Sequence, residues 1–295
     1  VWWDEAQYLL MTKHLAEDTP TTGWWEGRSI TYPWMLRLLS PAGYSENWVR
    51  ILNLLMGLGF TVTSYYLVKE LFNKEYAAIT GLIMSTQWVF LYWALRVTIG
   101  VPSALFLALS NLYYLKKNRV ISGAFLGIAF TIRFTAGLMG LVYLINDLLN
   151  KSKLEDYYWL GGVIIGISPL IIHDLIVYAN PVHTPLTFLR LNLKSSGGSQ
   201  AGGALYYLNN MLFNYGWVMG LLVYLGFIPL ITKLSNNKVR FTALNLLTYL
   251  GFYSLITSVK EVRFLIHLLP YFCILAVMGA KLILNSVIKD KQLVT

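Results

Sequence analysis

The sequence predicts an all-α bundle of transmembrane helices. Hydrophobic residues make up 56% of the chain and charged residues only 13%, whereas about a quarter of an ordinary soluble domain is charged. Apolar runs of about 20 residues, the length that a helix needs to cross a bilayer, follow one another along the 295 residues. A mean hydropathy of +0.55 agrees with a polytopic membrane protein.

We expect one integral membrane domain over residues 1–295. The opening segment 1–47 is rich in aromatic and polar residues and is predicted to be an external loop, and residues 48–295 are predicted to be the transmembrane bundle. Because no apolar run stands ahead of Asp4, we expect a first transmembrane helix to precede this chain. The predicted spans are 48–68, 76–95, 101–115, 158–179, 215–232, 241–257 and 264–284.

The apolar stretch 121–145 is interrupted by Arg133. Each piece is too short to cross a membrane alone, so Arg133 could lie at the tip of a helical hairpin or broken helix pair. An arginine in an ordinary tilted helix, with its charged end extended to the interface, explains the same pattern. The two interpretations stay open.

A second external loop is expected over residues 180–214. Its Ser- and Gly-rich stretch 195–203 is typical of a flexible linker, and 205–213 indicates a short amphipathic helix in the interface plane. This order suits a lid over a lipid-facing cleft, and a plain linker fits equally well. The single cysteine, Cys273, lies in an apolar run, excludes an intramolecular disulfide and is typical of a packing residue.

Charged residues divide between the two predicted sides of the membrane. Lysine and arginine gather in cytoplasmic loops, and here they occupy alternate short connections: Lys69, Lys74, Lys116, Lys117, Arg119, Lys151, Lys153, Lys233, Lys238, Arg240, Lys281, Lys289 and Lys291. This distribution accounts for the net charge of +9 without nucleic acid. The charges that orientation does not explain fall on the non-cytoplasmic side: Asp4, Glu5, Glu26, Arg28, Arg96, Arg133, Asp174, Lys260, Glu261 and Arg263.

Several motifs are absent from the sequence. There is no Asp-x-Asp pair for a metal-bound nucleotide sugar, no Walker loop and no G-x-G-x-x-G. The four histidines show no metal-ligand spacing. The sequence therefore gives no support to a nucleotide-dependent enzyme or pump. We expect that no cofactor is required; a divalent metal could assist, but no pattern supports one.

One stretch near the last span resembles a known family. Lys260-Glu261-Val262-Arg263-Phe264, followed by Leu268-Leu269-Pro270, is similar to the H-K-E-x-R-F signature of GT-C glycosyltransferases of the family 22 type. Those are the dolichyl-phosphate-mannose-dependent mannosyltransferases of lipid-linked oligosaccharide and GPI assembly. The resemblance departs at Val259, which stands where the family has histidine, and the turn at Arg96 matches only loosely.

Three further stretches follow the family's order. Trp25-Glu26-Gly27-Arg28-Ser29 with Tyr32-Pro33 resembles its R-S-x-x-x-P stretch, and Asp4-Glu5 stands where the family has the D-E of its first luminal loop. Asp174, Thr184-Pro185-Leu186-Thr187-Phe188 and Asn192 resemble its D, P-x-x-F, N segment. The wider GT-C group also has D-E in its first external loop, so the resemblance defines the fold more closely than the subfamily.

Position and resemblance together favour Asp4 as the base that takes a proton from the acceptor hydroxyl. Glu5 is the second candidate, orienting Arg28 or the acceptor. Lys260 and Arg263 are the candidate cations for the donor phosphate, with interfacial anchoring as their alternative. The further candidates for the phosphate are Arg96 and Arg133, and those for acceptor binding or structural support are Arg28, Glu26, Asp174, Asn192 and Glu261.

We expect an inverting glycosyltransferase that moves a sugar, mannose above all, from a polyprenyl (dolichyl) phosphate to a glycolipid or lipid-linked oligosaccharide at the non-cytoplasmic face. A protein O-mannosyltransferase or an aminoarabinose-transferase-like GT-C enzyme is the alternative, with a protein acceptor in the first case. A transporter or flippase for lipid-linked sugars is the alternative of another class. The expected location is a prokaryotic cell membrane, or the endoplasmic reticulum if the source is eukaryotic.

Overall fold

The computed structural model describes residues 3–19, 27–40, 43–194, 203–257 and 260–294, and within these ranges every regular element is helical, as predicted. The α-helices are α1 (Trp3–Glu17), α2 (Thr31–Leu38), α3 (Glu46–Leu71), α4 (Lys74–Thr86), α5 (Trp88–Ala94), α6 (Gly100–Leu115), α7 (Arg119–Ile132), α8 (Leu138–Leu149), α9 (Trp159–Tyr178), α10 (His183–Lys194), α11 (Tyr206–Asn209), α12 (Met211–Tyr215), α13 (Trp217–Thr232), α14 (Asn237–Leu255) and α15 (Leu269–Val294). The 3-10 helices are η1 (Phe134–Gly137), η2 (Leu154–Tyr158) and η3 (Val262–Leu268).

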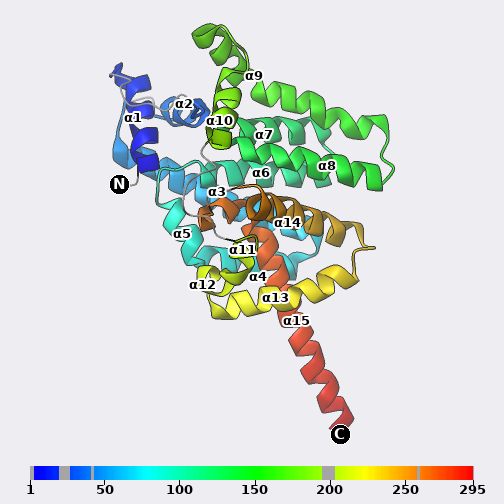
Figure 1. Cartoon of the computed structure of the whole chain (residues 1–295). Helices are drawn as coiled ribbons and strands as arrows, with labels where there is room; N and C mark the ends of the chain where they lie inside the picture. Colours follow the sequence, from blue (N-terminus) through cyan, green and yellow to red (C-terminus); the bar gives the residue numbers. More distant parts are fainter. Residues whose placement is uncertain (1–2, 20–26, 41–42, 195–202, 258–259, 295) are drawn as a thin grey trace.

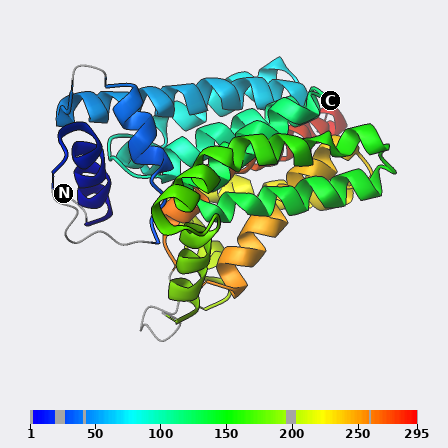
Figure 2. The same cartoon turned by 90° about the horizontal axis from the view of Figure 1, so that it is seen from above.

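The helices form a layered bundle. Helices α6 to α9 lie alongside one another, and α1 and α2 stand together at one end of them (Figure 1). Seen from above, α3 runs along one side of the bundle (Figure 2). The stretch 1–47, predicted as a loop, therefore contains two helices, α1 and α2.

Three described segments are long and apolar enough to cross a membrane: Glu46–Leu71, Leu154–Tyr178 and Val262–Val287. The pair Lys74–Thr86 and Trp88–Ala94 meets the same criterion when taken as one broken span. Helices α6 and α13 have 16 residues each, fewer than the roughly 20 of a full crossing, so the predicted runs 101–115 and 215–232 are shorter helices. The segments together are those of an integral membrane protein.

The predicted run 76–95 is bent by 63° between α4 and α5. Gln87 causes the break, because its backbone is extended with ψ 115° and its side-chain oxygen accepts a hydrogen bond from the Trp88 amide at 3.0 Å. Its side-chain nitrogen donates to the Tyr215 carbonyl at 3.0 Å. A polar side chain inside an apolar run thus ends one helix and begins the next.

The helix is also interrupted at Arg133, as the hairpin interpretation predicts. Helix α7 ends at Ile132, Arg133 is extended with φ −145° and ψ 110°, and the chain returns through η1 into α8. Phe130 packs against the turn, where a Cβ on Gly137 would lie 2.9 Å from its ring. The alternative, an arginine inside one continuous helix, is wrong for this stretch.

Helices α7 and α9 approach each other backbone to backbone. Gly123 and Gly127 on α7 face Gly162 and Gly166 on α9. A Cβ built on Gly162 would lie 2.1 Å from the Val120 carbonyl oxygen, and the other three positions are similarly crowded. Small residues at such interfaces let membrane helices come close enough for extensive van der Waals contact. This contact holds the hairpin against the candidate span that contains α9.

The predicted external loop 180–214 is largely helical where it is described. Helix α10 is followed by α11 and α12, two short helices in place of the single amphipathic helix predicted over 205–213. Asn210 separates the two helices, and its side-chain nitrogen donates a hydrogen bond to the Tyr206 carbonyl at 2.8 Å. Tyr207 and Met211 are buried, so both helices pack on the bundle. The predicted linker 195–203 lies almost entirely outside the described residues.

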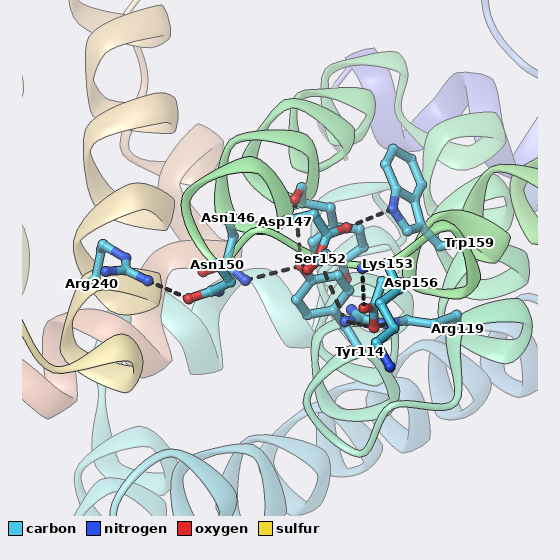
Figure 3. A network of polar contacts seen from close by, with 11 residues as sticks. Tyr114, Arg119, Asn146, Asp147, Asn150, Ser152, Lys153, Asp156, Trp159 and Arg240 are labelled. Atoms are coloured by element: carbon cyan, nitrogen blue, oxygen red, sulfur yellow. Dashed lines mark hydrogen bonds and ion pairs between the residues drawn. The ribbon is translucent and has the colours of Figure 1, made fainter.

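A buried carboxylate fixes the end of the bundle away from the hairpin tip. Asp147 is fully buried and accepts hydrogen bonds from the Tyr114 hydroxyl at 2.5 Å and the Trp159 indole at 3.1 Å. Arg119 lies 3.5 Å from Asp147 and 2.8 Å from Asp156. Figure 3 shows these side chains pointing toward one another from α6, α7, α8, α9 and η2. The network joins the start of the hairpin to its end.

The adjacent glycines Gly161 and Gly162 test the α7–α9 contact. Gly162→Ala is expected to lower the stability by about 2 kcal/mol, because overpacking a close contact costs roughly 1 to 3 kcal/mol. Gly161→Ala is the matched control, since a Cβ there meets nothing within 4 Å and alanine is the better helix former. Thermal melting of the detergent-solubilised variants measures both effects. Equal melting temperatures for the two variants would contradict the predicted contact.

Candidate active site

Asp4 lies where three distant parts of the chain meet. It stands in the first turn of α1. Its Oδ1 pairs with Arg28, just before α2, and its Oδ2 lies 2.6 Å from Arg263 Nη1 in η3. The Asp4 side chain is 26% exposed, against 9% for Arg28 and 19% for Arg263. We call these three residues the Asp4 cluster.

Opposing effects set the protonation of Asp4. Burial on its own raises the pKa of the Asp4 carboxyl, but the charges and hydrogen bonds of Arg28 and Arg263 outweigh burial and hold the pKa below its usual value. The carboxylate is therefore ionised at neutral pH. Its ion pairs contribute stability above the unfolded-state pKa, and that contribution is lost as the pH falls through the lower folded-state pKa.

Tyr8 supports the Asp4 cluster from one helical turn along α1. Arg28 Nη1 donates a hydrogen bond to the Tyr8 hydroxyl at 3.2 Å, and the Arg28 guanidinium lies 5.2 Å from the centre of the Tyr8 ring. Burial raises the pKa of the Tyr8 hydroxyl, so the phenol stays neutral and accepts this hydrogen bond. Sequence reasoning missed Tyr8, although residues four apart share one face of a helix.

Glu5 has a different environment from Asp4. It is buried, its Oε1 lies 2.5 Å from Arg50 Nη1, and the same oxygen accepts a hydrogen bond from the Val97 amide at 3.1 Å. Arg96 lies 3.5 Å from the other oxygen. The structure therefore places Glu5 against Arg50 and Arg96, and the role predicted for it, orienting Arg28 or the acceptor, stays a prediction. It ties α1 to α3 and to the turn after α5.

Sequence reasoning also missed Arg50. It stands near the start of the first apolar run, four residues after Glu46, with which it forms an exposed ion pair at 2.7 Å. That pattern is typical of an arginine at the membrane interface. Only the fold brings Glu5 to the same guanidinium.

Arg133 lies at the hairpin tip against aromatic rings. Its guanidinium is 5.7 Å from the centre of the Tyr253 ring and 5.0 Å from that of Phe264. Its positive charge also acts on the Tyr8 hydroxyl. Among the residues that the structure describes, no carboxylate oxygen lies within 4.0 Å of this guanidinium. Arg133 is half-buried, so it presents a cation that an anionic ligand could neutralise.

Lys260 contacts the end of α14. Its ammonium donates hydrogen bonds to the carbonyls of Tyr253, Ser254 and Thr257 at 3.0, 2.7 and 2.9 Å. Burial lowers the pKa of this ammonium. A lysine that satisfies the last carbonyls of a helix has a capping role. In this structure the Lys260 ammonium is bound to main-chain oxygens, and its place beside the donor phosphate stays a prediction.

Glu261 links the last span to α11. Arg263 Nη2 donates to its Oε1 at 3.0 Å. The Tyr207 hydroxyl accepts a hydrogen bond from the Glu261 amide at 3.2 Å and lies 3.3 Å from the Glu261 carbonyl. Glu261 therefore contacts Arg263 directly, and its role in acceptor binding or structural support stays a prediction.

Asp174 is hydrogen-bonded to the start of α10. It is fully buried and accepts hydrogen bonds at 2.7 Å from both the amide and the hydroxyl of Thr184, which begin α10. Helix α10 then reaches the hairpin, where Phe188 lies 5.0 Å from Phe134 between ring centres. Asp174 is thus a structural support. Glu26, Val259 and the side chain of Asn192 lie outside the described residues.

The described residues do not assemble three or more His, Cys, Asp or Glu side chains into a group that could hold a metal ion. The partners of Asp4 are guanidinium groups. The site therefore consists of one partly exposed carboxylate among arginines, with a further arginine at the hairpin tip. Such an arrangement can take a proton and can bind an anion beside it.

Glu5 and Glu46 share Arg50 and provide a matched pair of variants. Glu5→Gln is expected to lower the free energy of unfolding by about 2 kcal/mol, because it removes the buried carboxylate that pairs with both Arg50 and Arg96, and Arg50 keeps its exposed ion pair with Glu46. Glu46→Gln is expected to cost no more than about 0.5 kcal/mol, since its ion pair is exposed. Thermal or denaturant unfolding in detergent measures the difference. Equal losses would show that Glu5 does not anchor α1.

Comparisons with known proteins agree on the fold. Residues 25–295 match the sequence model of the Alg9-like mannosyltransferase family. The structure is similar to ArnT from Cupriavidus metallidurans bound to undecaprenyl phosphate, with a TM-score of 0.74, 18% identity, and coverage of 95% of this chain and 56% of that one. The apo form of ArnT gives a TM-score of 0.72 at 19% identity, with coverage of 95% and 55%.

A more distant similarity extends to an archaeal protein. The oligosaccharyltransferase AglB from Archaeoglobus fulgidus, in complex with an inhibitory peptide and a dolichol-phosphate, matches with a TM-score of 0.64 at 12% identity, over 98% of this chain and 47% of that one. The chain thus spans about half the length of these solved structures. A comparison with curated protein sequences gave no match. The GT-C fold that the sequence predicts is confirmed.

Proposed function

Because this chain belongs to the Alg9-like mannosyltransferase family, we propose that it is an inverting glycosyltransferase that moves mannose from a polyprenyl phosphate to a hydroxyl group of a glycolipid or lipid-linked oligosaccharide. The observation that carries the proposal is the Asp4 cluster, a carboxylate held between two arginines, with Arg133 at the neighbouring hairpin tip. Carboxylate and cations are the groups that this transfer needs.

In the proposed reaction, Asp4 is the base. The acceptor oxygen attacks C1 of the sugar and forms the new bond, its proton passes to the Asp4 carboxylate, and the bond from C1 to the phosphate oxygen breaks with its electron pair on the phosphate. Polyprenyl phosphate leaves with a second negative charge, which Arg133 and Arg263 neutralise. The proton on Asp4 then returns to water. A single displacement inverts the configuration at C1, and no step requires a metal.

Two observations support a lipid-phosphate donor. The similar structures of ArnT and AglB contain undecaprenyl phosphate and a dolichol-phosphate, respectively. Within this chain, Arg133 follows the apolar helix α7 and Arg263 stands at the start of the last candidate span, where a lipid chain can remain in the bilayer while its phosphate reaches them.

The distribution of basic residues supports a non-cytoplasmic site. Arg119 begins α7 and Arg133 follows its last residue, so the two lie at opposite ends of a helix about 20 Å long. The lysines Lys116 and Lys117 accompany Arg119 at the far end. By the positive-inside rule that end is cytoplasmic, which puts the Asp4 cluster at the other face.

Replacing the base tests the proposal. Asp4→Asn is expected to reduce kcat at least about 100-fold, because general-base catalysis contributes 10²- to 10⁴-fold, while the donor still binds. The assay follows transfer from polyprenyl-phosphate mannose to a glycolipid acceptor by purified protein in lipid nanodiscs. Asp18→Asn is the control, since Asp18 lies exposed just after α1. Transfer by Asp4→Asn at the parent rate would remove Asp4 from the mechanism.

A further inference from the structure

We propose, resting on the function above, that Arg263 changes partners during the reaction. In the free protein its guanidinium is bound to Asp4, and when the lipid donor arrives it transfers to the donor phosphate. Asp4 is thereby released to accept a proton only when a donor is in place. Arg263 is a positioning residue for Asp4 before it binds the phosphate, and the two substrates bind in order, with the donor first.

Asp4 is blocked as a base in the free protein. Each of its two oxygens is paired with a different guanidinium. The same two arginines hold its pKa below the usual value, and a carboxylate of low pKa is a weak proton acceptor. Losing one arginine frees one oxygen and makes that carboxylate a stronger base.

Arg28 is the arginine that stays. Its side chain is only 9% exposed. It donates a second hydrogen bond to the Tyr8 hydroxyl and lies against the Tyr8 ring. Movement away from Asp4 would break these contacts as well, so Arg28 continues to orient the carboxylate.

Arg263 is the arginine that can leave. Its side chain is more exposed, and its Nη1 makes the contact with Asp4, while its Nη2 donates to Glu261. The guanidinium also lies 5.3 Å from the centre of the Trp93 ring. Glu261 and Trp93 therefore still contact Arg263 after it leaves Asp4, so the guanidinium keeps partners during the exchange.

Arg133 places the incoming phosphate within reach. The guanidinium groups of Arg133 and Arg263 both border the Phe264 ring, at 5.0 and 5.7 Å from its centre. Because no described carboxylate neutralises Arg133, a phosphodiester is drawn to it first. Held there, the phosphate can replace Asp4 as the anion next to Arg263.

A binding measurement tests the exchange without turnover. The probe is dolichyl phosphate, titrated into purified protein in nanodiscs. We expect Asp4→Asn to bind it about tenfold more tightly than the parent, because the parent must first break a charged hydrogen bond. Asp4→Glu, which keeps the charge, is expected to bind like the parent. Asp4→Ala gives the same comparison as Asp4→Asn if that variant does not fold.

A double variant separates the exchange from a general effect of charge. Removing any nearby negative charge would tighten phosphate binding, but the exchange requires Arg263. In the Arg263→Gln background, Asp4→Asn is therefore expected to give no gain. A gain that persists there, or equal affinities of parent and Asp4→Asn, would overturn the exchange.

The outcome is independent of sugar transfer. If the gain is seen and depends on Arg263, but the parent transfers no sugar in the assay, the proposed reaction fails while the exchange stands. If transfer occurs without the gain, the exchange alone fails. If neither parent nor variants bind dolichyl phosphate, both the donor class and the exchange are wrong.

Discussion

The ion pairs of Asp4 connect the beginning of the chain to its last candidate span. Arg263 in η3 and Arg28 before α2 meet on one carboxylate in α1. Without that carboxylate, two guanidinium groups would face each other in a partly buried place, where like charges repel strongly. The positions of α1, α2 and η3 relative to one another therefore depend on Asp4, and the same carboxylate is the base in the proposed reaction.

The other arginines near Asp4 differ in their partners: some contact a carboxylate, and Arg133 contacts aromatic rings. Glu5 is buried and lies between Arg50 and Arg96, and Arg50 also pairs with Glu46, so these contacts give structural support to α1. Arg133 rests on aromatic rings, a contact that stabilises a cation without neutralising it. The site consequently has an excess of positive charge at the hairpin tip, which suits an anionic ligand and disfavours further carboxylates.

Sequence reasoning predicted the apolar helices, because they depend on local patterns, but it took the stretch that contains α1 and α2 for a loop. Apolar runs require helices in a membrane, and Arg133 breaks one of them because a charge in the middle of a span is costly. The partners of each charge could not be predicted. Lys260 stands three residues before Arg263, yet one caps α14 and the other reaches Asp4, and spacing along the chain does not determine the direction of each side chain.

Asp147 and Asp4 lie at opposite ends of the bundle and differ in burial. The difference decides whether a ligand can reach the carboxylate. Asp147 is fully buried, receives hydrogen bonds from Tyr114 and Trp159 on packed helices, and also lies 3.5 Å from the Arg119 guanidinium. Asp4 is partly exposed and is held by charged side chains alone. Of these partners, Arg263 is the one that the donor phosphate takes over in the proposed exchange, while Arg28 stays. The two carboxylates therefore differ in access: the fold leaves Asp4 partly exposed to a ligand and encloses Asp147.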